Sequence, residues 1–166
     1  MPAIQRQQMK RQNKIDRTAL VCATDLLEHQ DHSEARLRQK LKIRKYSDED
    51  INKTIETLKK YNYINDERAC SYQFDIMYHS DKYSMRQIYA KLLTLGFKEE
   101  LIDKFKPEDY EDHEEIAAIC LLKSRFKKPT EIKKMQQFLY TKGFDYSVIT
   151  SAVDKFKIDI ENDEDE

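Results

Sequence analysis

Residues 135–144 read MQQFLYTKGF, and residues 89–97 read YAKLLTLGF, with the same glycine–phenylalanine ending. The chain has 2 glycines, and both stand in these pairs, as Gly96-Phe97 and Gly143-Phe144. When the two phenylalanines are superposed, a leucine falls five residues before each, an isoleucine or methionine nine before, and an isoleucine five after. The apolar pattern around the pair is therefore repeated.

A third copy of the pattern is centred on Tyr46, although no glycine precedes it. The aromatic residues at 46, 97 and 144 are 51 and then 47 residues apart, which is the size of a repeat of two or three helices. The chain is thus predicted to be an internal repeat. The matching apolar residues are Leu37, Ile88 and Met135 before the aromatic residue, then Leu41, Leu92 and Leu139, and finally Ile51, Ile102 and Ile149 after it.

Each glycine–phenylalanine pair is typical of a helix end. Glycine adopts the left-handed conformation just past a helix without steric cost, and the next residue packs back on the last turn. Phe97 is therefore expected to lie on Leu92, and Phe144 on Leu139. In the first copy Lys45 occupies the glycine position, so we expect that end to be more strained or differently capped.

The stretch KKYNYINDER, residues 59–68, is interpreted as a joint between two helices. Asn62 is the next best residue for a left-handed helix end, and Tyr63 lies five residues after Leu58, the last apolar position of the preceding helix. The short polar side chains of Asn65 or Asp66 then suit the start of the following helix, because they can accept hydrogen bonds from its free amides.

Helix starts and stops of this kind predict an all-α fold of tandem three-helix repeats, stacked into an elongated, curved molecule. We expect a basic arm over 1–15, repeats over 16–62, 63–107 and 108–157, and a disordered acidic tail over 158–166. The expected helices span about 16–30, 33–45, 47–61, 66–80, 84–95, 98–105, 111–127, 130–142 and 145–157.

Composition agrees with this fold and excludes several classes of protein. With 2 glycines and 3 prolines in 166 residues, a sandwich or barrel with many tight hairpins is hard to build. No apolar run suits a membrane span or a secretory signal, so we expect a cytoplasmic protein with no membrane contact. The 3 cysteines are expected to be small core residues, since they are far apart and lack metal-ligand spacing.

The sequence shows no catalytic constellation. The 4 histidines have no metal-ligand spacing, and two isolated glycines exclude a glycine-rich phosphate loop. Acidic runs such as 48–50 stand at helix starts, where the helix dipole explains them. We therefore expect no enzyme activity, no cofactor and no metal.

What remains is surface charge on the segment SEARLRQKLKIRKY, residues 33–46, in which Glu34 alone offsets six basic residues. Leu37 and Leu41 are expected to be buried, which leaves the basic side chains around the rest of the helix. This density of positive charge indicates an anionic partner as readily as a solvated face.

The segments LLEHQDHSEARLRQKL, residues 26–41, and INKTIETLKKYNYINDERACSY, residues 51–72, resemble the RecX family of bacterial recombination regulators. That family has an "HS..EL..KL" helix followed by a "GYIND.RFA" joint, although here Asn62 replaces the usual glycine and Ala69 the usual phenylalanine. The resemblance implies curved stacks of three-helix repeats that lie in the groove of the RecA filament on single-stranded DNA. It implies that such proteins restrain the ATPase and strand-exchange activities of RecA and are not enzymes.

We therefore expect a monomeric regulator of the RecA filament in recombination, DNA repair and the SOS response, with inhibition as the expected direction. Its contact with single-stranded DNA is expected to be weak and within the filament. The alternative is a helical-repeat adaptor for an unrelated protein, and an autonomous DNA-binding protein fits the net charge of -1 less well. The residues expected to contact RecA or DNA are Arg36, Arg38, Lys40, Lys42, Arg44, Arg68 and Arg86.

Overall fold

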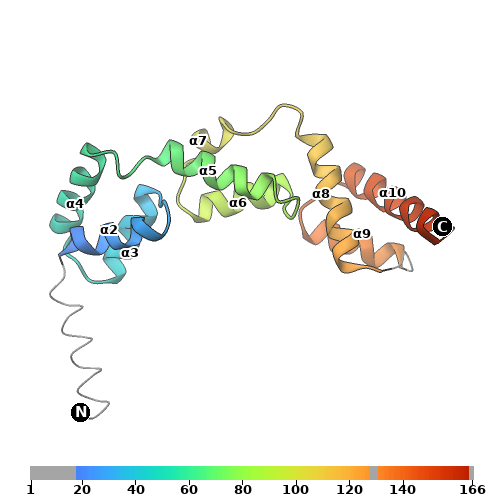
Figure 1. Cartoon of the computed structure of the whole chain (residues 1–166), viewed down its shortest axis with the longest axis horizontal. Helices are drawn as coiled ribbons and strands as arrows, with labels where there is room; N and C mark the ends of the chain where they lie inside the picture. The colour runs from blue at the N-terminus through green and yellow to red at the C-terminus, as the bar shows by residue number, and fades with distance from the viewer. Residues whose placement is uncertain (1–17, 128–130, 165–166) are drawn as a thin grey trace, which may run out of the picture. The chain divides into compact units, whose positions relative to one another are not determined.

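The structure is a computed structural model that describes residues 18–127 and 131–164, and within this part of the chain all regular structure is helical (Figure 1). The chain divides into two compact units, Met1–Ala69 and Cys70–Glu166. The helices are α2 (Ala19–His29), α3 (Glu34–Ile43), α4 (Asp48–Lys60), α5 (Asp66–Tyr78), α6 (Met85–Thr94), α7 (Glu99–Asp103), α8 (Tyr110–Arg125), α9 (Ile132–Thr141) and α10 (Tyr146–Glu164). The predicted all-α fold is confirmed.

In the first unit, α2, α3 and α4 pack against one another around a small apolar core. Serine or threonine begins each of these helices, because a side-chain oxygen of Thr18, Ser33 or Ser47 accepts a hydrogen bond from an amide of the first turn. The buried members of the core are Ala23, Leu37, Leu41, Ile51, Ile55, Leu58 and Ile64.

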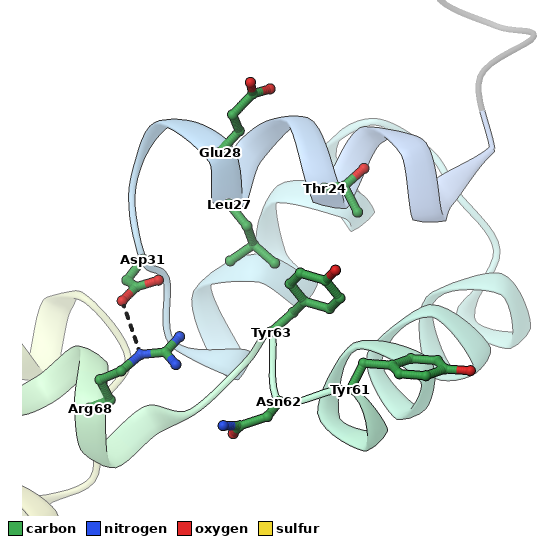
Figure 2. A pocket seen from close by; sticks show the side chains of 8 residues that line it. All are labelled: Thr24, Leu27, Glu28, Asp31, Tyr61, Asn62, Tyr63 and Arg68. Carbon is green, nitrogen blue, oxygen red and sulfur yellow. Dashed lines mark hydrogen bonds and ion pairs between the residues drawn. The ribbon is translucent and has the colours of Figure 1, made fainter.

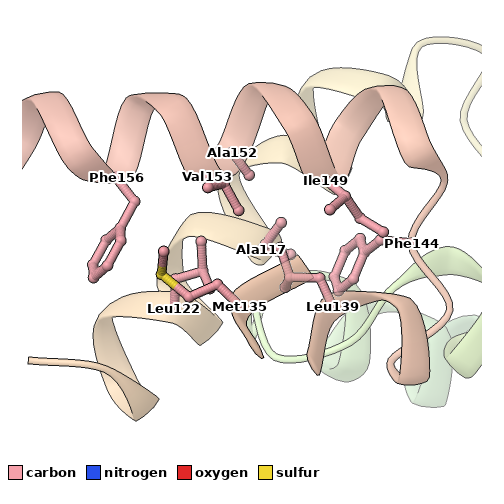
Figure 3. Close-up of a cluster of buried hydrophobic side chains, with 10 residues drawn as sticks. Ala117, Leu122, Met135, Leu139, Phe144, Ile149, Ala152, Val153 and Phe156 are labelled. Carbon is pink, nitrogen blue, oxygen red and sulfur yellow. The ribbon is translucent and has the colours of Figure 1, made fainter. Parts of the chain in front are cut away.

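In the second unit, α10 packs along α8 and α9, and their apolar faces close a second core (Figure 3). The apolar positions that the sequence aligns in its three copies are all buried: Leu37, Ile88 and Met135; Leu41, Leu92 and Leu139; and Ile51, Ile102 and Ile149. The apolar pattern that repeats in the sequence therefore identifies residues buried in the interiors of both units.

The predicted helix ends are also confirmed. Gly96 has φ 88° and Gly143 has φ 87°, and Asn62 and Lys45 are left-handed at φ 56° and 66°. The same two backbone hydrogen bonds occur at each of these four helix ends. At Gly143, its amide donates to the carbonyl of Tyr140, and the amide of Phe144 donates to the carbonyl of Leu139. Lys45, after α3, thus adopts the left-handed conformation of the glycines although it has a side chain. Of the two alternatives for this helix end, strain applies and a different cap does not.

Two sequence expectations need correction. The last helix does not stop at 157: α10 continues to Glu164, so residues 158–164 are helical rather than a disordered tail. The extension is held because Asp159 pairs with Lys123 of α8 at 2.8 Å and Ile160 packs against the core. Cys120 is exposed rather than a core residue, since it lies on the outer face of α8.

Some expectations fall outside the described residues, namely the basic arm 1–15, the helix start at 129–130 and the last two acidic residues. None of the described helices combines the length and the apolar composition that a membrane span requires.

Candidate functional site

Helix α3 and its C-cap residue, Arg44, carry five of the seven basic residues expected to bind a partner. Helical geometry sorts them into two groups. Arg36, Lys40 and Arg44 follow one another at intervals of four residues, so they share one face of the helix. We call these three residues the basic strip. Leu37 and Leu41 of the same helix are completely buried, so they hold the helix against the core of the first unit.

The residues outside the strip are paired with neighbouring side chains. Arg38 contacts Glu34 at 2.8 Å and donates a second hydrogen bond to Asn52 at 2.7 Å. Lys42 lies 3.5 Å from Asp48. Glu34 also pairs with Lys59 at 2.8 Å, and the hydrogen bonds from Lys59 and Arg38 lower the pKa of its carboxyl group below the ordinary value.

The basic strip has no carboxylate partner among the described residues. Arg36 donates to the side-chain oxygen of Gln39 at 2.6 Å, and Arg44 donates to the backbone carbonyl of Lys40 at 2.9 Å. The amine of Lys40 lies 2.9 Å from Nε2 of His32. Neutral acceptors therefore position the three cations, and no carboxylate within 18–127 and 131–164 compensates their charge.

Burial and the neighbouring positive charges both lower pKa values in this group. Partial burial and then the charges of Arg36 and Arg44 lower the pKa of Lys40. Burial, Lys40 and Arg36 lower the pKa of His32, against an opposing effect of Asp31. An ammonium group can only donate, so the contact with Lys40 requires a neutral His32 ring that accepts at Nε2. A bound anion would relieve this repulsion, which makes the strip a candidate anion-binding site.

The two remaining predicted residues lie elsewhere. Arg68, in the first turn of α5, pairs with Asp31 in the loop between α2 and α3, with 3.4 Å between Nε and Oδ2. Arg86, in the first turn of α6, is exposed, and its aliphatic part lies beside Gly143. Arg86 therefore belongs to the second unit, and Arg68 belongs to a separate feature of the first unit.

That feature is a pocket of about 560 Å³, which we call the tyrosine pocket (Figure 2). It lies where the end of α2 and the following loop meet the joint between α4 and α5. Its lining residues are Thr24, Leu27, Glu28, Asp31, Tyr61, Asn62, Tyr63 and Arg68.

Sequence reasoning identified the joint correctly but missed the pocket. Asn62 ends α4 in the left-handed conformation, and Asn65 accepts a hydrogen bond from the amide of Arg68 at 3.0 Å, as a helix cap should. Tyr63 occupies the position that follows a left-handed helix end, yet it is 59% exposed, and the next residue, Ile64, enters the core instead. The pairing of two tyrosines around a left-handed asparagine was the signal available in the sequence.

Histidine, cysteine and acidic side chains of the described residues do not gather into a group that would suit a metal ion. The first unit carries two candidate binding features, the basic strip and the tyrosine pocket.

Comparisons with known proteins point to one family. A profile of the first three-helix domain of RecX matches residues 19–58, which include the basic strip. The regulatory protein RecX of Thermotoga maritima is 34% identical over 150 residues, covering 88% of this chain and 89% of that protein. The RecX of Caldanaerobacter subterraneus is 33% identical over 122 residues, which is 73% of this chain, and the chain spans 61% of that relative's length.

The fold has a solved counterpart. The crystal structure of RecX from Lactobacillus salivarius matches with a TM-score of 0.67 at 18% identity, covering 84% of this chain and 95% of that one. At this identity the match describes the fold.

Proposed function

Because this chain belongs to the RecX family of regulatory proteins, we propose that it binds the RecA filament on single-stranded DNA and restrains its ATPase and strand-exchange activities. It acts by binding rather than by chemistry, in recombination and DNA repair within the cytoplasm. The observation that carries the proposal is the basic strip, three cations on one face of α3 without a carboxylate partner among the described residues.

The strip suits the phosphates of a nucleic acid or acidic groups on a filament. Arg36 and Arg44 each offer a planar fork of donors that matches a phosphate, while Lys40 supplies a point charge between them. Because His32 and neutral acceptors already order these side chains, less conformational entropy is lost when an anion binds.

The residues of the predicted set differ in the part we assign to them. Arg36, Lys40 and Arg44 are proposed as the primary contacts. Arg38 and Lys42 lie on the flank of the same helix and are proposed to add long-range attraction, since their charges are partly compensated. Arg68 and Arg86 are proposed as contacts of their own, outside the strip.

The test measures ATP hydrolysis by RecA on single-stranded DNA as this protein is added. We expect hydrolysis to fall, and we expect the protein alone to hydrolyse no ATP. The variant Lys40→Glu/Arg44→Glu should lose the effect. Its matched control is Lys53→Glu/Lys157→Glu, which carries the same change in charge at residues paired with Glu49 and Asp154. No change in RecA activity at saturating protein, or full regulation by the strip variant, would refute the proposal and favour an adaptor for another protein.

A further inference from the structure

Backbone hydrogen bonds fix the turn of the joint that carries the two tyrosines of the tyrosine pocket. The amide of Asn62 donates to the carbonyl of Lys59 at 2.9 Å, and the amide of Tyr63 donates to that of Leu58 at 2.8 Å. Tyr61 and Tyr63, on either side of Asn62, are 65% and 59% exposed. Large aromatic side chains on a fixed turn are typical of recognition surfaces, because little freedom is lost when a partner contacts them.

Among the described residues, a lysine amine lies over one of the two rings and no cation lies over the other. The amine of Lys60 lies over the ring of Tyr61, 5.9 Å from its centroid. Figure 2 shows the other ring, Tyr63, extending from the joint toward Leu27 and Thr24 of α2. The face of an aromatic ring attracts positive charge, and the neighbouring leucine offers a surface for an aliphatic stem.

The charges at the rim of the pocket favour a cation as well. Glu28 and Asp31 flank the carboxyl end of α2, where the helix dipole adds negative potential. Arg68 compensates Asp31 across 3.4 Å, whereas Glu28 makes no ion pair with the part of the chain that the structure describes. The pocket therefore combines an aromatic wall with a net negative rim.

We propose that the tyrosine pocket receives a lysine or arginine side chain of a protein partner. The aliphatic stem lies on Leu27 and the Tyr63 ring, and the charged head contacts Glu28 and Asp31. A nucleobase would stack on the same ring, but the two carboxylates outnumber the single cation, Arg68, among the lining residues, which opposes the approach of its phosphate.

This inference rests on the proposed function in one respect: it supplies the protein contact that would distinguish a filament from bare DNA. The basic strip begins four residues after His32, and His32 directly follows Asp31 of the pocket. The first unit thus presents a positive and a negative feature from neighbouring segments, and such a pair selects a partner that carries both signs of charge.

The first experiment needs no filament. Chemical shifts of the full-length protein are followed by NMR during titration with N-acetyl-arginine amide, N-acetyl-glutamine amide or deoxyadenosine monophosphate. We expect the arginine compound to shift the signals of Tyr63 and Leu27, and Tyr63→Ala or Glu28→Gln to weaken its binding roughly tenfold. The controls Tyr140→Ala and Glu56→Gln remove an exposed tyrosine and an exposed carboxylate outside the pocket and should change nothing.

Equal shifts with the glutamine compound, or shifts with the nucleotide instead of the arginine compound, would overturn the proposal; the nucleotide result would make the pocket a base-binding site. The second experiment is co-sedimentation with RecA filaments, in which Tyr63→Ala should reduce filament binding and leave bare-DNA binding unchanged. If the arginine compound binds as expected but the unaltered protein does not sediment with filaments, the proposed function fails while the pocket proposal stands for another partner.

Discussion

The carboxylate of Asp66, at the start of α5, accepts a hydrogen bond from the backbone amide of Glu34, at the start of α3, across 2.8 Å. An equivalent contact occurs in the second unit, where Glu114 of α8 accepts from the amide of Met85, the first residue of α6. In both cases the amide follows a buried capping serine, Ser33 or Ser84. In both units a carboxylate from a later helix, α5 or α8, therefore caps the start of an earlier helix, α3 or α6.

This relationship predicts that Asp66→Ala destabilises the protein by about 1–2 kcal/mol, because an amide at the start of α3 loses its partner. Asp75→Ala is the matched control, since it removes an exposed carboxylate from the same helix. Urea denaturation checks both variants. Equal stability of the two would show that the Asp66 contact contributes nothing to folding.

The second prediction concerns Gly96 and Gly143, the glycines that end α6 and α9. Gly143→Ala should destabilise by more than Gly96→Ala, although both replace a left-handed glycine at a cost of roughly 1 kcal/mol. A Cβ at Gly143 would lie 3.2 Å from Cδ of Arg86 and 3.3 Å from Oγ of Ser84, and Ser84 donates a hydrogen bond to the carbonyl of Lys142 at 2.7 Å. Thermal unfolding of the two variants tests the order, and a smaller loss at Gly143 contradicts it.

Much of this fold could be predicted because its signals are local. A left-handed helix end needs glycine or asparagine, and a buried face needs apolar residues at helical spacing, so Gly96, Gly143 and Asn62 could be read directly from the sequence. Asp81 is also left-handed, at φ 52°, but aspartate is common at helix starts and turns, so its identity did not single it out.

The candidate site was less predictable because charge compensation depends on contacts between distant residues. The sequence places Arg38 and Arg36 on one basic helix, but it does not reveal that Arg38 reaches Asn52 while Arg36 stays unpaired with any described carboxylate. The cap from Glu114 to Met85 and the exposed ring of Tyr63 likewise arise from packing between elements.

The third prediction uses two neighbouring glutamates whose pKa values shift in opposite directions. Burial raises the pKa of Glu114, whereas hydrogen bonds from Lys155 and Ser151 lower the pKa of Glu115, each from an ordinary value of 4.5. Glu114 therefore contributes stability that is lost as pH rises through its folded-state pKa. Glu115 contributes stability that is lost as pH falls below 4.5 through its lowered pKa.

The free energies of unfolding of Glu114→Gln and Glu115→Gln, measured by urea denaturation as a function of pH, test this pair. Relative to the unaltered protein, Glu114→Gln should gain stability as pH rises above 4.5. The deficit of Glu115→Gln should shrink as pH falls below that value. Parallel pH profiles for both variants and the unaltered protein would contradict the assignment.

The fourth prediction links the basic strip to pH through His32. Burial and the charges of Lys40 and Arg36 lower the pKa of His32 below 6.5, and a phosphate bound at the strip should raise it again. Affinity for single-stranded DNA should therefore increase as pH falls below 6.5, more steeply in the unaltered protein than in His32→Gln. Fluorescence anisotropy with a labelled oligonucleotide measures this, and identical pH profiles would exclude His32 from the site.

The most direct test of the central claim compares binding to preformed RecA filaments with binding to bare single-stranded DNA over a range of salt concentrations. Phosphate contacts release counterions, so the logarithm of the affinity for bare DNA should fall with that of the salt concentration by about 0.7 per contact. A filament adds protein contacts, so we predict tighter binding with a shallower salt dependence. Equal affinity for filament and bare DNA, with the same salt dependence, would contradict a regulator of the filament.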